Sequence, residues 1–69
     1  MTQHERILQY MDDFGSITPM DAFMDLGITK LATRIGEIAR RGHKIEKQIE
    51  HAKNRYGQSV HYMRYRRAV

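Results

Sequence analysis

Apolar side chains recur at helical spacing between Thr29 and Gly42. They stand at positions i, i+4, i+7 and i+8, which together form one buried face of a helix. The residues at these positions are Leu31, Ile35, Ile38 and Ala39. Thr29 can cap the first turn, and Gly42 stands where a left-handed residue would end the helix. We therefore expect a helix over about residues 29 to 41.

A first helix is expected near the start of the chain. Thr2 and Glu5 form a capping-box pattern, and apolar residues then recur at helical spacing. The helix should span about residues 3 to 14 and end at Gly15. Met11 and Phe14, near its end, are expected to lie in the core.

A second helix is expected over about residues 19 to 26. Ile17 can pair as a short extended segment, Thr18 is a strong cap, and Pro19 suits the first helical position. The helix should end near Gly27, where a tight reversal needs positive φ. It is rich in apolar residues for its length, so most of its surface should be covered.

Beyond Gly42 the apolar spacing changes from helical to alternating. This pattern predicts a β-hairpin over about residues 44 to 66 with a basic turn. Pairing Ile45 with Tyr65 would place on one face Ile45, Ile49, His61, Met63 and Tyr65, whereas a slip of one residue would exchange the faces. Residues 66 to 69 are expected to leave the strand and fray.

Charge is distributed unevenly along the chain. Residues 1–28 hold one basic and five acidic residues, a net charge of −4, whereas residues 29–69 hold eleven basic and three acidic residues, a net charge of +8. Such a split lets one face attract a polyanion while the acidic face stays in solvent. On charge alone, nucleic-acid binding and simple solubility explain the basic residues equally well.

Length and composition exclude several classes of protein. A chain of 69 residues forms at most one domain with a modest core. The absence of cysteine excludes disulfides and thiolate sites. The first residues lack the pattern of a signal peptide, and no apolar run reaches membrane-spanning length, so we expect a cytoplasmic protein with no membrane contact.

Catalytic and metal-binding patterns are also lacking in the sequence. His43, His51 and His61 do not follow the i, i+4 spacing of helical metal ligands, so we expect no metal site. The chain has no nucleophile with a paired base and no glycine-rich phosphate loop. We therefore expect neither an enzyme nor a cofactor.

The expected order of elements is that of a winged helix-turn-helix domain, with a reader helix after a turn that contains Gly27. Residues 15 to 46 resemble small winged helix-turn-helix proteins of bacteriophages and prophages. The resemblance rests on Ser16-Ile17-Thr18-Pro19, Leu26-Gly27-Ile28, Leu31-Ala32-x-Arg34-Ile35, Arg40-x-Gly42-x-x-Ile45 and Tyr65-Arg66. It implies an α+β fold in which a three-helix helix-turn-helix core precedes a C-terminal β-hairpin wing, as a single domain over residues 1–69.

The resemblance also implies a function. It points to a double-stranded DNA-binding protein at the nucleoid of a bacterial host, either a small phage or prophage transcriptional regulator or a recombination accessory factor. The alternative is a phage-encoded inhibitor or adaptor that docks on a host or phage protein, with tyrosines near the C-terminus as anchors. Monomer and homodimer both remain open.

If the helix over residues 29 to 41 enters the major groove, its outward side chains approach the DNA. These candidates are Thr29, Lys30, Thr33, Arg34, Glu37, Arg40 and Arg41. Arg34 is the first choice for reading guanine, because its planar fork matches two acceptors. Glu37 either accepts from cytosine or pairs with Arg34 or Arg41, and the ion pair is favoured.

Further candidates lie outside this helix. Thr18, with the first amides of its helix, and Lys44 are expected at the DNA backbone. The wing candidates, placed for the adjacent minor groove or backbone, are Lys53, Asn54, Arg55 and Tyr56.

Gly36 interrupts the reader helix at its middle. Glycine there costs about 1 kcal/mol relative to alanine. It either permits close approach of the first helix or of a DNA phosphate backbone, or is tolerated because packing compensates. We favour packing.

Overall fold

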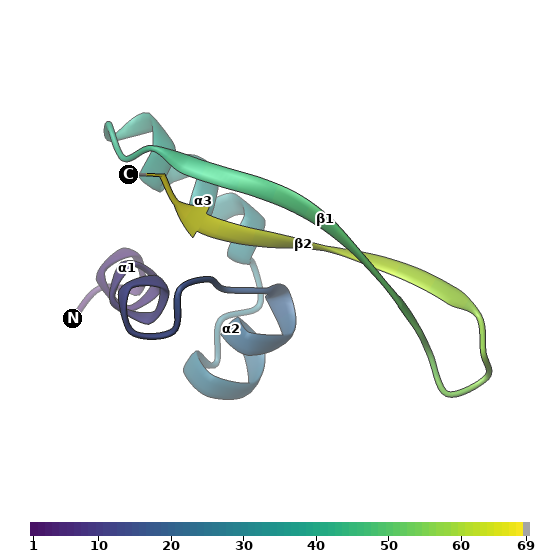
Figure 1. Cartoon of the computed structure of the whole chain (residues 1–69). Coiled ribbons are helices and arrows are strands. Elements are labelled where there is room, and N and C mark those ends of the chain that lie inside the picture. Colours follow the sequence, from purple (N-terminus) through teal and green to yellow (C-terminus); the bar gives the residue numbers. More distant parts are fainter. Residues whose placement is uncertain (69) are drawn as a thin grey trace.

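The computed structural model describes residues 1–68 of the chain. Three helices gather at one end of the molecule, and an antiparallel hairpin projects from them (Figure 1). The elements are α1 (Gln3–Phe14), α2 (Pro19–Leu26), α3 (Leu31–Arg40), β1 (Ile45–Lys53) and β2 (Ser59–Arg67). The molecule measures 39 × 23 × 21 Å, with the hairpin along its long dimension. The predicted fold class, a three-helix core followed by a hairpin wing, is confirmed.

Local capping explains where α1 and α2 begin. The hydroxyl of Thr2 accepts from the backbone amide of Glu5 at 3.1 Å, and the carboxylate of Glu5 accepts from the amide of Thr2 at 2.9 Å. Thr18 and Asp21 make the same reciprocal pair, with both distances 3.1 Å. Each box satisfies amides that the first helical turn leaves without partners.

The start of α3 differs from the prediction. Thr29 does not cap it; Lys30 occupies the N-cap position and makes no side-chain capping hydrogen bond. The physical reason is that Ile28 and Leu31 are both buried, so the two residues between them complete the turn instead of beginning the helix. At the other end, Gly42 adopts the expected positive φ, 100°.

The hairpin register is shifted by two residues from the predicted one. Ile45 lies opposite Arg67, and Tyr65 lies opposite Lys47. The turn causes this shift, because the side chain of Asn54 accepts from the amides of Tyr56 and Gln58 and so fixes where the strands part. A shift of two residues preserves the faces, so the predicted shared face is retained.

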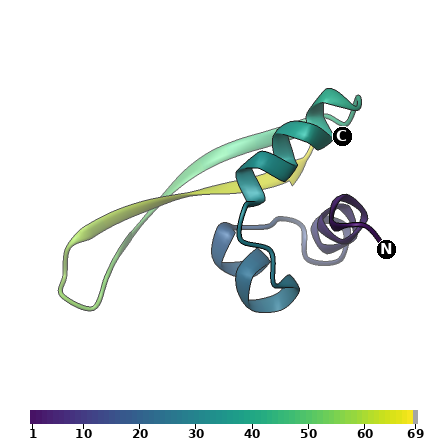
Figure 2. The same ribbon diagram turned by 180° about the vertical axis from the view of Figure 1, so that it is seen from behind.

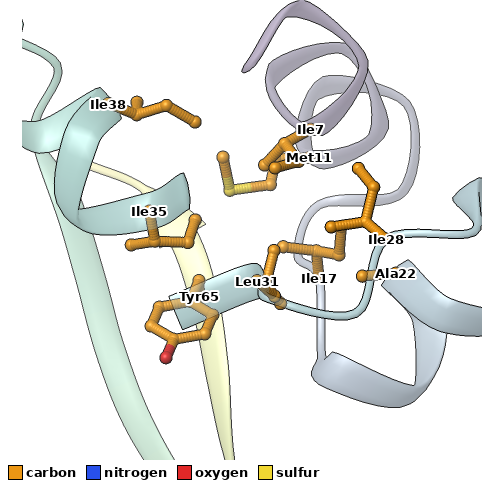
Figure 3. Close-up of a cluster of buried hydrophobic side chains, with 9 residues drawn as sticks. All are labelled: Ile7, Met11, Ile17, Ala22, Ile28, Leu31, Ile35, Ile38 and Tyr65. Carbon is orange, nitrogen blue, oxygen red and sulfur yellow. The ribbon is translucent and has the colours of Figure 1, made fainter. Parts of the chain in front are cut away.

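The core lies where the three helices meet the base of β2 (Figure 3). Tyr65 packs beneath Ile35, and its backbone exchanges two 2.9 Å hydrogen bonds with Ile17, which adds a single bridge to the edge of the hairpin. Nine residues form this cluster: Ile7, Met11, Ile17, Ala22, Ile28, Leu31, Ile35, Ile38 and Tyr65.

Three expectations about burial are wrong. Phe14 is 70% exposed, because it stands at the solvent side of the last turn of α1 against the ring of Tyr10. Ala39 is exposed, because the buried face of α3 centres on Ile35 and Ile38. α2 is not mostly covered, since only its inner side meets the core; its exposed apolar residues are Met20, Phe23 and Met24.

The end of β2 is also more ordered than expected. The predicted fraying at Arg66 is wrong, because the strand continues through Arg67 and Arg67 forms an ion pair with Asp12 of α1 at 2.9 Å. The amide of Ala68 then donates to the carbonyl of Lys44. The same expectation for Val69 lies outside the described residues.

Candidate nucleic-acid interface

The helix α3 has one anchored face and one open face. Leu31, Ile35 and Ile38 are buried against the core, whereas Thr33 and Arg40 on the opposite side are exposed. Seen from behind, α3 crosses in front of the sheet and no other element lies over it (Figure 2). The open face is therefore available to a partner along the length of the helix.

Arg34 belongs to the flank of α3 rather than to the centre of its open face. Its Nη1 atom donates to Oε1 of Glu37 at 2.7 Å, so the favoured ion pair is present. Its Nε atom is buried without a hydrogen-bond partner. Arg34 and Arg41 also line a shallow hollow together with the first residues of the chain, including His4.

Glu37 joins α3 to the start of α1. Its Oε1 atom lies 2.8 Å from Nε2 of His4 as well as 2.7 Å from Arg34. The hydrogen bonds from His4 and then Arg34 lower the pKa of Glu37 below its usual value, because both favour the carboxylate. The network fixes the flank of α3 on which Arg34 stands.

Gly36 has no packing role in the fold. Outside the local backbone of α3, a β-carbon at this position would meet only Nη1 of Arg40, at 3.6 Å, which is an ordinary contact. Neither α1 nor the sheet approaches this position. Close approach of the first helix to Gly36 is therefore wrong, whereas the favoured explanation, that packing of the rest of the helix compensates for glycine, stays a prediction.

The two expected backbone positions differ in their surroundings. Thr18 is buried, and its hydroxyl is already engaged with Asp21, whose carboxylate stands at the N-terminus of α2. This carboxylate takes the place that a phosphate would occupy at a helix N-terminus. Lys44 is exposed between α3 and β1, and its side chain is open to solvent.

The wing candidates also separate into two groups. Lys53, Arg55 and Tyr56 are exposed at the tip of the hairpin, and Tyr56 is 84% exposed. Asn54 instead holds the turn, because its side chain bonds two amides and donates to the side chain of Gln58 at 3.0 Å. The cationic tip is thus presented by a turn that Asn54 stabilises.

The structure brings some of the candidates together and separates others. α3 carries Thr33, Glu37 and Arg40, and Arg41 caps its end. Thr29 and Lys30 are exposed before its first residue, whereas the wing tip lies at the far end of the hairpin (Figure 1). Sequence reasoning missed His4, which reaches the site from a position 33 residues before Glu37. No local pattern in the sequence signals so distant a contact.

Comparison with known proteins supports this arrangement of elements. The sequence model of a family described as a winged helix-turn-helix domain matches residues 2–66. Domains of this family are typically DNA-binding and are typically not enzymes. No curated protein and no solved structure matches the chain. Within residues 1–68, no helix has the length and apolar character required to cross a membrane.

Proposed function

Because this chain belongs to the winged helix-turn-helix domain family, we propose that it is a sequence-specific double-stranded DNA-binding protein that inserts α3 into the major groove. Its cellular role would be that of a small phage or prophage transcriptional regulator or recombination accessory factor. The observation that carries the proposal is the uncovered face of α3, which presents cationic and hydroxyl side chains while the opposite face is held by the core.

We propose different roles for the residues on the open face of α3 and at its start. Thr33 and Arg40 are exposed opposite the buried stripe, so we place them at base edges, where hydroxyl and guanidinium groups hydrogen-bond. Thr29 and Lys30 flank the start of the helix and would contact the first bases or the adjacent backbone. Arg34 remains a candidate for reading guanine, but only if its ion pair with Glu37 breaks or if Arg34 makes both contacts at once.

Phosphate contacts would hold the helix in the groove. Arg41 and Lys44 stand at the end of α3 and just beyond it, where they can follow one strand of the backbone. At the wing, Lys53 and Arg55 would reach the flanking backbone or minor groove, with Tyr56 against a sugar. We assign Asn54 and Thr18 to holding the turn and the helix start rather than to direct DNA contact.

Selection from random-sequence duplexes, followed by titration of the selected duplex at several salt concentrations, tests the proposal. The logarithm of the association constant should fall linearly with the logarithm of salt concentration, because bound cations displace counterions from phosphates. The selected duplex should bind about a thousandfold or more tighter than a scrambled duplex of the same length. Binding independent of salt, or equal for both duplexes, would contradict sequence-specific recognition.

A protein-binding adaptor is the second candidate function, and one observation favours it. Apolar side chains of α2 are exposed near an acidic one. Phe23 and Met24 are 56% and 69% exposed, and Asp25 follows Met24 directly in sequence. The occupant we would expect is a host protein with a basic and apolar contact surface. A partner retained from nuclease-treated lysate by the wild type and lost by Met24→Ser would support this function, whereas retention only with DNA would oppose it.

A further inference from the structure

Gly36 is the one position of α3 where the residue type conflicts with the needs of the helix. Its φ is not positive, so its backbone conformation is open to any residue. A β-carbon would meet only the flexible end of Arg40 at 3.6 Å. Alanine would fit this space and is a better helix former than glycine. The fold itself therefore gives no reason for glycine at this position.

The surroundings of Gly36 place it within the open face described above. Thr33 and Arg40, three residues before it and four after it, are its neighbours on the helix surface, and both are exposed. Nη1 of Arg40 lies 3.6 Å from the β-carbon position, so the guanidinium group rests low over the helix backbone. A base edge that hydrogen-bonds to Arg40 would therefore lie beside Gly36 on the same face of the helix.

We infer that Gly36 is the point of closest approach between α3 and the base-pair edges of the major groove, and that its missing side chain sets the depth of the helix in the groove. The inference rests on the DNA binding proposed above. Glycine lets a ligand approach the backbone directly. A methyl group would make only an ordinary contact with the guanidinium group of Arg40, but it would lift the base edge away from the backbone of α3.

The variant Gly36→Ala separates this role from a structural one, because the two roles predict opposite changes. Thermal unfolding followed by circular dichroism should show a rise in Tm of about 4 to 8 °C, as expected for alanine in a small helical protein. Fluorescence anisotropy with the selected duplex should show affinity lower by about tenfold or more, the loss of one good base contact. Affinity for the scrambled duplex should stay unchanged.

The matched control is Gln9→Ala, an alanine substitution on the exposed surface of α1. It should leave binding of both duplexes unchanged. Gly36→Leu should weaken binding of the selected duplex further than Gly36→Ala does.

Four outcomes would overturn the inference. A fall in Tm for Gly36→Ala would show that the fold requires glycine. Unchanged affinity for the selected duplex would remove the role of Gly36 while leaving the proposed function in place. Equal losses on both duplexes would assign Gly36 to the DNA backbone instead of base edges. A wild-type chain that binds no duplex at all would refute the proposed function, and the inference with it.

Discussion

Nε2 of His4 lies 2.8 Å from Oε1 of Glu37, and this contact joins the first turn of α1 to the flank of the candidate reader helix. The same carboxylate oxygen accepts from Nη1 of Arg34 at 2.7 Å. The orientation of Arg34 is thus tied to a residue near the N-terminus. His4 and Glu37 are far apart in sequence, so the sequence alone does not predict their contact. The contact nevertheless helps to orient Arg34, which is a candidate for base recognition.

Replacing Glu37 with glutamine should change the acid sensitivity of the fold. His4 and Arg34 lower the pKa of Glu37 in the folded state below its usual 4.5, so the ionised carboxylate stabilises the fold above that pH. This stabilisation is lost as the pH falls through the lowered pKa. Glu37→Gln should therefore show a smaller drop in Tm between about pH 5 and pH 3 than the wild type does.

The control is Glu46→Gln, which removes the same charge from an exposed position on β1. It should retain the wild-type pH dependence. An identical acid response of Tm in Glu37→Gln and the wild type would refute a stabilising role for this network.

Loss of the cap at Thr18 should destabilise the whole domain. Its hydroxyl accepts from the amide of Asp21 at 3.1 Å, and the residue is buried. Thr18→Ala should lower the free energy of unfolding by about 1 kcal/mol, as measured by urea denaturation. Thr18→Ser keeps the hydroxyl and should recover most of the loss; no recovery would mean that the methyl group matters more than the cap.

Arg40 should contribute to sequence preference. It is exposed on the open face of α3, so its removal should leave the fold intact. Arg40→Ala should reduce the preference for one base pair by about 1 to 3 kcal/mol, measured with a panel of single-base variants of the selected duplex. A uniform loss across the panel would instead place Arg40 at a phosphate.

The wing should contribute equally to the binding of every DNA sequence. Lys53 is exposed beside the turn that Asn54 holds, at the end of the hairpin far from the core. Lys53→Ala should weaken the selected and scrambled duplexes equally and reduce the slope of log K against log salt by about 1. Lys47→Ala, on β1 nearer the core, provides the comparison; an unchanged slope for Lys53→Ala would remove the wing tip from the interface.

Much of the fold could be predicted because its signals are local. The reciprocal caps at Thr2 and Thr18 depend on residues three positions away, and the alternation after Gly42 predicts the hairpin. The register of the two hairpin strands was harder to predict, because it depends on how the side chain of Asn54 closes the turn. Burial of the helix side chains was harder still to predict. Phe14 matches the helical pattern as well as Met11 does, yet Met11 is buried and Phe14 is 70% exposed.

By itself, the sequence determined the order of elements, the helix caps and the division of charge, since each depends on residue types at short spacing. Only the tertiary structure decided which candidates are free to bind. It brought His4 against Glu37, the ion-pair partner of Arg34, paired Asp12 with Arg67, and left no other described element within 4 Å of a β-carbon at Gly36. The physical reason is that a side chain's availability depends on neighbours brought close by folding, and these neighbours come from distant parts of the chain.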